Sequence, residues 1–364
     1  MTAAPPDPSG GSVFVTRKYP PAVGGMETFA RLVGDALERM GRTERITLGS
    51  SQRHLSWFLP WAALRTAWRL AGGGAGRVVC GDPVVLVALL PVLWIRRPQV
   101  AVVVHGLDLV YPNRLYRGVV QRSLRRADRV LAISTATRAE AVRLGVDEER
   151  LVTVLPAAEA PAPPDTPRAE RRAAMCARLG IDPAHDVVLT VGRLIPRKGA
   201  RWFVEHVVPV LPERTHYVVA GSGPDLEPVL HAVAEARLSH RVHVLGSVDE
   251  DLREVLLGAA DVFVMPNVPV AGDMEGFGLV AVEAALRATP VIAARLEGIE
   301  DAVIDGTTGQ LCPPGDAAAF AAAIEGLLAR PEAERAGLGA AYAAEAARRF
   351  GVDQLAEVVA AALR

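Results

Sequence analysis

Short apolar runs alternate with helix-forming segments in two successive series, and this alternation most constrains the fold of the chain. The first series predicts strands at residues 13–15, 77–80, 100–105, 129–133 and 152–155. The second predicts strands at residues 186–191, 215–220, 241–245, 262–265 and 290–293. Strands that alternate with helices across glycine-rich connections are typical of doubly wound parallel sheets. The sequence therefore predicts an α/β protein with two Rossmann-like domains.

A proline-rich stretch separates the two series. Residues 156–167 contain five prolines, and proline can continue neither a central strand nor the interior of a helix. We therefore interpret this stretch as an interdomain linker. The predicted domains are residues 1–160 and 161–349, followed by a helical tail at residues 350–364.

Composition narrows the class of protein. A chain of 364 residues suits two domains that each bury a core. The net charge of −1 gives no indication of nucleic-acid binding. The three cysteines, Cys80, Cys176 and Cys312, are too few and too scattered for a disulfide framework or a zinc site. We expect them to be small core residues in a reducing compartment.

No segment indicates secretion or membrane insertion. Residues 1–12 lack a basic flank followed by an apolar region. The most apolar run, residues 84–95, is interrupted by Pro91 and is too short to span a bilayer, so we expect buried Rossmann-type structure there. These features predict a cytoplasmic protein, and peripheral contact with the inner membrane face stays open as an alternative.

Two glutamates, Glu275 and Glu283, stand eight positions apart around the small turn Phe277-Gly278-Leu279. A helix that begins at Phe277 or Gly278 would offer free N–H groups and its positive dipole end to a phosphate. Glu283 would then lie roughly 10 Å further along, at about 1.5 Å per residue. That is the span from the sugar end of a diphosphate to its ribose, and each carboxylate can accept hydrogen bonds from hydroxyls. An isolated pair with this spacing would indicate only a solvated helix surface.

A basic pair upstream changes that interpretation. Arg193 and Lys198 lie in one short segment and can neutralise phosphates. The chain holds only two lysines, Lys18 and Lys198, against 38 arginines. A retained lysine indicates a position that needs a compact ammonium, with chance retention as the alternative. Together the basic pair and the glutamates predict a site for a sugar joined to a nucleoside through a diphosphate.

With these residues the chain resembles the retaining glycosyltransferases of the GT-B fold, of the family-4 or glycosyl transferases group 1 type. The resemblance extends from the Gly24-Gly25 loop to residues 313–316. It implies two Rossmann-like domains that face a central cleft, with residues 1–160 on the acceptor side and residues 161–349 binding the nucleotide sugar. The family also implies that the helix within residues 350–364 crosses back to the first domain.

The resemblance assigns roles around the donor. Glu275 would bind the hexose hydroxyls, Phe277, Gly278 and Leu279 would supply backbone N–H groups, and Glu283 would bind the ribose. Further donor-binding residues would be Gly24, Gly25, Gly221, Gly223 and Val248, of which Gly25 would come closest to the phosphates and Val248 would lie beside the base. Without the resemblance, these glycines would be interpreted as ordinary turns.

His105 ends an apolar run and is followed by Gly106 and Asp108. A polar residue at the carboxyl end of a parallel strand faces the crevice where α/β proteins bind ligands. The resemblance implies that His105 contacts the 6-position of the donor sugar, although a lone histidine is often structural. Asp108 could instead cap the next helix.

The chemistry implied is transfer by front-side attack, because no second carboxylate is placed as a nucleophile. Arg193, Lys198 and the helix N-terminus would position the donor and stabilise charge. No Asp-x-Asp motif is present, so we expect no metal ion and no cofactor beyond the nucleotide diphosphate sugar, with UDP and GDP both open. His105, Arg193, Lys198 and Glu275 would form the catalytic set.

Two stretches bear on the acceptor. Trp57, Trp61, Leu64 and Trp68 are spaced as one helical face. We expect this face to pack on the first domain, and the alternative is an exposed surface for a lipid-linked or aromatic acceptor or for a membrane. Residues 113–129 carry six arginines, expected on a solvated helix face that could also hold an anionic acceptor or lipid. Residues 156–159 depart from the Pro-Asn-Gly turn usual in the family, which leaves any acceptor role of that turn in doubt.

The function predicted is transfer of a hexose from a UDP- or GDP-sugar to an acceptor hydroxyl, with retention of configuration. The acceptor would be a small molecule, a glycan or a lipid-linked molecule, and no nucleic-acid partner is expected. Two alternatives stay open: a nucleotide-sugar epimerase of the same architecture, and a non-catalytic nucleotide-sugar binding protein.

Overall fold

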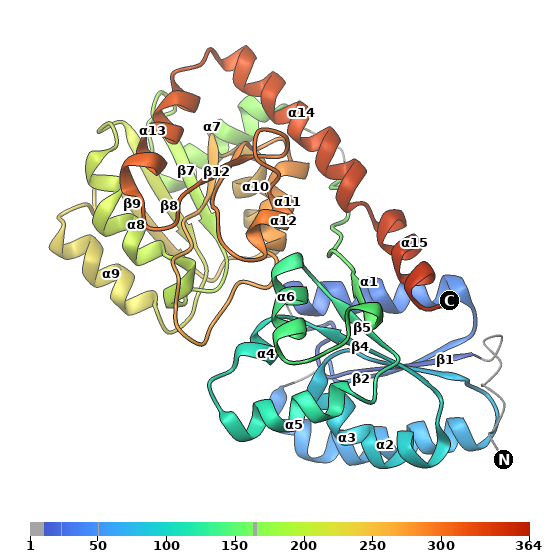
Figure 1. Cartoon of the computed structure of the whole chain (residues 1–364). Helices are drawn as coiled ribbons and strands as arrows, with labels where there is room; N and C mark the ends of the chain where they lie inside the picture. The colour runs from blue at the N-terminus through green and yellow to red at the C-terminus, as the bar shows by residue number, and fades with distance from the viewer. Residues whose placement is uncertain (1–10, 23, 50, 163–165) are drawn as a thin grey trace. The chain divides into compact units, whose positions relative to one another are not determined.

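The computed structural model describes residues 11–22, 24–49, 51–162 and 166–364, which form two compact units (Figure 1). Unit 1 runs to Ala157 and also contains Val352–Arg364, while unit 2 is Ala158–Gly351. The predicted boundaries at residues 160 and 349 lie a few residues from these. Val23 of the predicted ligand loop and residues 163–165 of the predicted linker lie outside the described residues.

Unit 1 is built on a six-stranded parallel sheet in the order β2-β1-β3-β4-β5-β6. Its strands are β1 Ser12–Thr16, β2 Thr43–Thr47, β3 Arg77–Cys80, β4 Gln99–Val104, β5 Arg129–Ala132 and β6 Leu151–Thr153. The helical segments are α1 Gly25–Met40, η1 Gln52–His54, α2 Leu55–Ala71, α3 Pro83–Arg96, α4 Leu107–Val110, α5 Arg114–Leu124, α6 Thr135–Arg143, η2 Glu148–Arg150 and α15 Val352–Ala362. The central strands of the sheet are buried apolar runs, as expected for a parallel sheet with both faces covered, whereas the edge strand β2 buries only Ile46.

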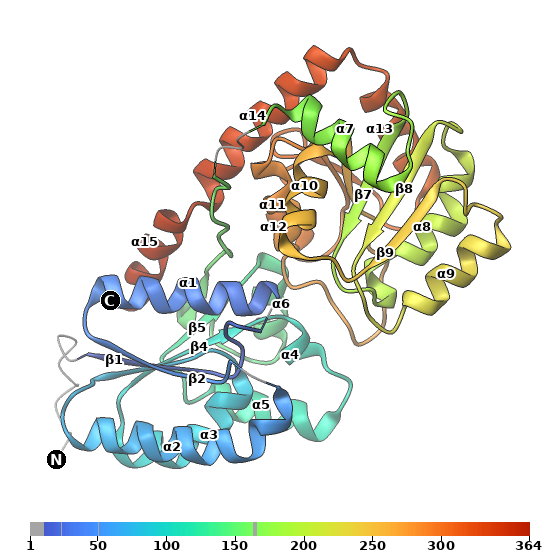
Figure 2. The same ribbon diagram turned by 180° about the vertical axis from the view of Figure 1, so that it is seen from behind.

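Helices cover both faces of this sheet. In Figures 1 and 2, α2, α3 and α5 lie on one side of the sheet and α1 lies on the other. The last helix, α15, packs against α1. Its end is held by hydrogen bonds from Arg77 Nη2 to the carbonyl of Leu363 at 2.7 Å and from Arg129 Nε to that of Ala362 at 3.3 Å. Helix α15 is therefore part of unit 1, although it follows unit 2 in the sequence.

Unit 2 contains a second six-stranded parallel sheet, in the order β12-β11-β10-β7-β8-β9. Its strands are β7 Asp186–Val191, β8 Thr215–Ala220, β9 Val242–Gly246, β10 Val262–Met265, β11 Val291–Ala294 and β12 Gln310–Cys312. Its helical segments are α7 Arg168–Leu179, η3 Pro196–Lys198, α8 Ala200–His206, η4 Val208–Val210, α9 Leu226–Glu235, α10 Glu250–Ala259, α11 Leu279–Leu286, α12 Ile299–Ala302, α13 Ala317–Leu328 and α14 Glu332–Phe350. The strand order reverses between β7 and β10, which makes the gap between these strands the topological switch point where α/β sheets bind ligands.

The predicted α/β class, with a parallel sheet in each of two Rossmann-like domains, is confirmed. Cys80, Cys176 and Cys312 are buried free thiols, as expected of core residues. The apolar run at residues 84–95 falls within helix α3, which continues through Pro91 and buries one side, including Val85, Leu86, Leu89 and Leu93, while its end is exposed at Trp94 and Ile95. No helix among the described residues is long and apolar enough to cross a membrane.

One expectation about unit 1 is wrong. The tryptophan face of α2 does not pack on the domain, because Trp57, Trp61 and Trp68 are 55%, 46% and 62% exposed. The helix instead buries Phe58, Ala62 and Thr66. The exposed tryptophan stripe and the buried stripe are offset by one residue along α2, and both contain apolar side chains.

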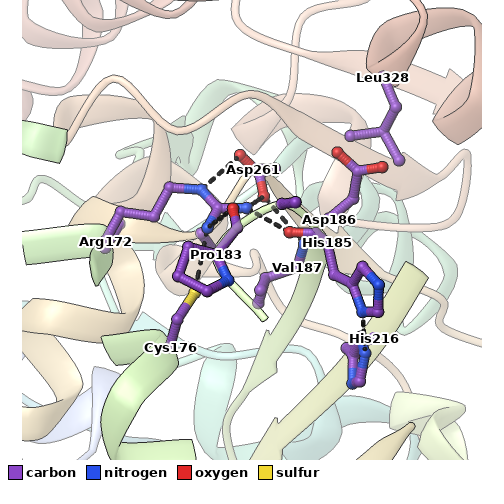
Figure 3. A network of polar contacts seen from close by, with 12 residues as sticks. Arg172, Cys176, Pro183, His185, Asp186, Val187, His216, Asp261 and Leu328 are labelled. Carbon is purple, nitrogen blue, oxygen red and sulfur yellow. Dashed lines mark hydrogen bonds and ion pairs between the residues drawn. The ribbon is translucent and has the colours of Figure 1, made fainter. Parts of the chain in front are cut away.

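A buried ion pair ties unit 2 together near the amino ends of β7 and β10 (Figure 3). Arg172 donates from Nη2 to Asp261 Oδ2 at 2.7 Å, and the same oxygen accepts from the backbone N–H of Val187 at 2.9 Å. The Arg172 guanidinium also reaches Cys176 Sγ at 3.1 Å. Each partner of the pair is thereby satisfied by further hydrogen bonds, as a buried ion pair requires.

Three histidines stack beside this ion pair. His185 Nδ1 lies 2.9 Å from His216 Nε2, and His216 Nδ1 lies 2.9 Å from His243 Nε2. Burial, together with the neighbouring His243 and His185, lowers the pKa of His216 to about 4, and burial lowers that of His243. With its pKa lowered, the ring of His216 is neutral near pH 7, where it can donate from one nitrogen and accept at the other.

We expect the stability of unit 2 to fall as the pH is lowered from about 6.5 to about 4. In this window the unfolded chain binds a proton at His216 that the folded chain does not, so acid favours unfolding. The loss should amount to roughly 3 kcal/mol at most, at about 1.4 kcal/mol per pKa unit. Urea titrations at several pH values measure it. His216→Asn should flatten the slope, whereas His231→Asn, at an exposed position paired with Glu235, should not. An identical slope in the two variants would contradict the assignment.

Candidate functional site

The loops that follow β7 and β10 meet at the switch point of the unit 2 sheet. Lys198 ends the short helix η3 in the first loop, and the segment from Pro266 follows β10. A Cβ on Gly199 would lie 1.8 Å from the carbonyl oxygen of Pro266, so the two loops are in direct backbone contact. The backbone N–H of Val268 donates to the carbonyl of Arg197 at 3.0 Å. This contact fixes the basic segment against the segment that leads to Glu275.

Glu275 lies at the centre of this arrangement. Its Oε2 is 2.5 Å from Lys198 Nζ and accepts from Asn267 Nδ2 at 3.1 Å. Arg197 forms an ion pair with the same oxygen and holds Asp273 at 3.0 Å. Burial tends to raise the pKa of Glu275, but Lys198 and Arg197 outweigh it and hold that pKa below its ordinary value. The buried carboxylate is therefore ionised at neutral pH.

The sequence motifs predict Glu275 and Lys198 in one site, but they do not indicate Arg197 or Asn267. Arg197 stands in the same basic segment, so its position was the available signal. The motif that predicts the site contains Arg193 and Lys198 but not Arg197, so its spacing does not point to Arg197. Asn267 carried no signal, since it follows a strand as a single amide.

Arg193 differs from Lys198 in its surroundings. Its side chain is exposed, and it has no ion-pair or hydrogen-bond partner among the residues that the structure describes. The backbone on either side is fixed, because Gly192 N–H donates to Ala220 at 3.0 Å and Leu194 N–H donates to Ser222 at 2.9 Å. Arg193 is thus an exposed guanidinium on an ordered loop, available to an anion.

The loops after β8 and β9 extend the same edge of the sheet. A Cβ on Gly221 would lie 1.8 Å from the carbonyl oxygen of Gly192, and one on Gly223 would lie 2.2 Å from that of Leu194. Both glycines are therefore required for packing on the Arg193 loop, whatever they bind. Ser222 and Ser247 then join the next loop through their hydroxyls at 2.9 Å, beside the half-buried Val248.

Helix α11 begins slightly later than expected. Gly278 is its N-cap with a left-handed backbone (φ 93°), a conformation that favours glycine, and the helix starts at Leu279. Phe277 is buried and packs edge-on against Phe350 at 5.8 Å. Glu283 is consequently just over one turn into the helix, about 6 Å along its axis from Leu279. The expected distance of roughly 10 Å is therefore too long when it is counted from the start of the helix at Leu279.

Glu283 is held by cations from two helices. Arg253 of α10 forms an ion pair with its carboxylate, and Arg287 Nη1 donates to its backbone carbonyl at 2.8 Å. Burial raises the pKa of Glu283, and the two arginines oppose that rise. Arg253 is thirty residues away in the sequence, and the sequence analysis had no signal for it.

The predicted residues of unit 1 also lie at the carboxyl ends of strands. Gly24 is the N-cap of α1, and Gly25 is its first residue. A Cβ on Gly24 would lie 2.5 Å from Glu27 Oε2, and Lys18 Nζ is 3.4 Å from the other carboxylate oxygen. The first glycine therefore has a packing role beside the buried Glu27.

His105 follows β4, with its ring against the end of β3. Its Nε2 lies 2.9 Å from the carbonyl of Gly81, and its backbone N–H donates to Asp108 Oδ2 at 3.0 Å. Nδ1 has no hydrogen-bond partner among the described residues. Burial raises the pKa of Asp108, with His105 opposing and Asp82 adding to the rise. The histidine is thus positioned by one ring nitrogen, and the other is unengaged.

Two family models match this chain in succession. The model described as Glycosyl transferase 4-like domain matches residues 12–158, and the one described as Glycosyl transferases group 1 matches residues 185–330. These matches correspond to the two units. Each model covers one parallel sheet.

Known proteins are similar over parts of this length. The D-inositol 3-phosphate glycosyltransferase 2 of Catenulispora acidiphila is 33% identical over 246 residues, 64% of this chain and 55% of that protein. The glycogen synthase of Mycobacterium tuberculosis is 35% identical over 152 residues, 40% of this chain and 34% of that protein. The chain spans about half the length of the D-inositol 3-phosphate glycosyltransferases that it matches.

Solved structures match over nearly the whole chain. HepE from Anabaena in complex with UDP has a TM-score of 0.76 at 20% identity, covering 97% of this chain and 99% of its own. Sucrose-phosphate synthase from Thermosynechococcus elongatus has a TM-score of 0.75 at 23% identity, covering 95% and 96%. At these identities the likeness establishes the fold, which is the GT-B fold.

Proposed function

This chain belongs to the glycosyl transferases group 1 family, and we propose that it transfers a hexose from a nucleotide diphosphate sugar to an acceptor hydroxyl with retention of configuration. The observation that carries the proposal is the cluster of Glu275, Lys198 and Arg197 at the switch point of unit 2. An ionised carboxylate that is paired with two cations can accept hydrogen bonds from sugar hydroxyls on one side. The two cations can then face a diphosphate on the other side.

Each residue of the site has a role in this proposal. Lys198 and the exposed Arg193 neutralise the diphosphate, with the first N–H groups of α11 beside them. Glu275 accepts hydrogen bonds from the hexose hydroxyls, and Glu283 accepts those of the ribose. Gly221, Gly223 and Val248 border the nucleotide. In unit 1, Gly24 and Gly25 approach the donor phosphates, and His105 contacts the sugar.

The proposed transfer takes place in one step, without a covalent intermediate between the sugar and the protein. The acceptor oxygen forms a bond to the anomeric carbon on the face from which the diphosphate leaves, and the bond between that carbon and the phosphate oxygen breaks. The acceptor proton passes to the leaving oxygen, and the product is a nucleoside diphosphate. The protein contributes position and charge stabilisation.

The names of similar proteins support a nucleotide-sugar donor. Structures of HepE are complexes with UDP and with UDP-glucose, and one relative from Mycolicibacterium smegmatis is named as a GDP-mannose-dependent mannosyltransferase. We therefore include both UDP- and GDP-hexoses as donors. The acceptor is proposed as a small molecule, a glycan or a lipid-linked molecule.

Incubation with UDP- and GDP-hexoses tests the proposal. A transferase releases nucleoside diphosphate and forms a new glycoside, which mass spectrometry detects in a screen of donors against acceptors. An epimerase would yield an isomeric sugar, and a binding protein would yield neither product. Either of the last two results would overturn the assignment.

We expect activity to persist in excess EDTA. Lys198 and Arg193 supply the positive charge that a divalent ion supplies in other transferases. Initial rates with and without EDTA should agree within about twofold. A strict requirement for added Mn²⁺ or Mg²⁺ would mean that the phosphates are neutralised in another way.

A further inference from the structure

A long stretch of unit 1 has arginines but no acidic side chain on its surface. Between residues 50 and 127 the chain contains two acidic residues, Asp82 and Asp108, and both are buried. Helices α2, α3 and α5 contain no acidic residue at all. The same stretch holds the arginines Arg53, Arg65, Arg69, Arg77, Arg96, Arg97, Arg114, Arg117, Arg122, Arg125 and Arg126. This asymmetry is local, because the whole chain has a net charge of −1.

Most of these arginines are exposed and unpaired. Arg65 and Arg69 bind Glu44 at 2.6 and 2.5 Å. The exposed arginines without an ion pair among the described residues are Arg53, Arg96, Arg97, Arg114, Arg117, Arg122 and Arg125. A solvated helix face in a protein of balanced charge normally mixes both signs. Here the acidic partners are missing from three helices.

Large apolar side chains are exposed on the same helices. Besides the tryptophans of α2, Trp94 is 72% exposed on α3. Further exposed apolar residues on these helices are Leu64, Ile95, Leu115 and Val119. Four of the five tryptophans of the chain are thus exposed here, and the fifth, Trp202, is half-buried in unit 2. Arg65 also lies over the ring of Trp68, 4.7 Å from its centre.

These helices form one continuous layer. Helix α3 packs against both α2 and α5, and Figures 1 and 2 show the three on one side of the unit 1 sheet. We call the exposed side of this layer the α2–α3–α5 face. Its tryptophans and arginines are therefore presented together.

A basic cavity opens at the edge of this face. It measures about 720 Å³, and Trp94, Arg97 and Arg126 line it together with Arg77 and Arg129. Arg77 is buried, and its hydrogen-bond partners among the described residues are both neutral, the Gln99 side chain and the Leu363 carbonyl. Burial accordingly lowers the pKa of Arg77. Apart from the exposed Asp128, the side chains that line the cavity are positive or neutral.

We propose that the α2–α3–α5 face docks unit 1 onto a bilayer that contains anionic phospholipids. Tryptophan rings favour the boundary between headgroups and acyl chains, where their apolar bodies are buried and their N–H groups stay hydrated. Arginines beside them bind lipid phosphates, and the cavity bordered by Trp94 and Arg97 can receive a phosphate headgroup. No acidic side chain on these helices repels the surface.

Flotation with lipid vesicles tests this surface on the whole chain. Binding is expected to phosphatidylcholine vesicles that contain about a third phosphatidylglycerol, and pure phosphatidylcholine should bind at least tenfold more weakly. High salt should reduce the binding, because it screens the arginines. Intrinsic fluorescence should shift to the blue as the four exposed tryptophans leave water. Equal binding to both vesicle types, or no binding, would overturn the proposal.

Variants separate the two components of the face. Arg114→Glu with Arg117→Glu should weaken binding at least about twentyfold, at roughly fivefold per lost arginine. Trp57→Ala with Trp61→Ala should weaken it at least about tenfold and reduce the blue shift. The matched control is Arg178→Glu with Arg330→Glu, exposed positions in unit 2, which should bind as the parent does.

Two outcomes contradict the assignment. Control and face variants that lose binding equally would mean that only net charge matters. The other possibility is that the α2–α3–α5 face joins two copies of the chain, and sedimentation velocity tests it. This holds if the parent chain dimerises, the tryptophan variants do not, and vesicle binding is the same in both. Because the arginines are exposed, the charge variants keep the test valid if a tryptophan variant fails to fold.

Discussion

Lys198→Ala is expected to lower turnover by at least about 10²-fold, the scale found when one preorganised charge-stabilising group is removed. Its ammonium lies 2.5 Å from Glu275 Oε2, so the substitution removes positive charge from the phosphates and releases the carboxylate that should bind the sugar. Arg193→Ala should cost a similar factor, because its guanidinium is exposed and unpaired in the described structure. Steady-state rates of nucleoside diphosphate release measure both.

The matched control is Arg201→Ala. Arg201 stands three residues beyond Lys198 on α8 and pairs with Glu205 at 2.7 Å, outside the glutamate cluster. It should leave turnover within about twofold, since an exposed ion pair contributes little. Circular dichroism should show all three variants folded. Near-normal rates for Lys198→Ala would remove the phosphate assignment.

Glu275→Gln and Glu283→Gln are expected to separate transfer from nucleotide binding. Glu283→Gln should weaken the bare nucleoside diphosphate and the donor alike, by about 1–3 kcal/mol, as expected for a hydrogen bond to a charged group. Glu275→Gln should leave the nucleotide bound at least as tightly, because Lys198 and Arg197 then lose their anionic partner. It should nevertheless lower transfer by at least about 10²-fold.

Calorimetry with the bare nucleoside diphosphate distinguishes the two glutamates. Glu227→Gln, at an exposed position in the first turn of α9, is the control and should change neither quantity. If both site variants lose the same affinity for the nucleoside diphosphate, the assignment of Glu275 to the hexose and Glu283 to the ribose is wrong.

The sequence predicted ten of the twelve strands and missed one edge strand in each sheet. The ten strands it indicated are present, with ends that differ by at most two residues, because most of them are buried apolar runs. The missed strands, β2 and β12, lie at the outer edges of their sheets. In β2 only Ile46 is buried, and β12 has three residues. An edge strand gains much of its stability from pairing with its neighbour, which an apolar pattern does not record.

The helical spacing of α2 identified a face but not its direction. Trp57 and Trp61 share one stripe, and Phe58 and Ala62 share the next. Both stripes are apolar, so the period alone could not decide which one the sheet buries. The outcome follows from the sheet, which accommodates Phe58 and leaves the larger rings in water.

At the candidate site the motifs predicted which residues lie close together, but not which of them form ion pairs. The sequence linked Lys198 to Glu275, yet it treated the lysine as free for phosphate, whereas the two side chains form an ion pair. It could not supply Arg253 for Glu283, because that pairing depends on how α10 packs beside α11. Contacts between elements distant in sequence require the tertiary structure.

The return of the chain to unit 1 has a consequence for the order of events during synthesis. The six strands of that unit are complete once β6 has been made, but α15, which covers α1, follows only after all of unit 2. Unit 1 therefore cannot close until the elements of unit 2 have been synthesised. Until then α1 lacks the helix that packs against it, which makes the first-made unit the last to be completed.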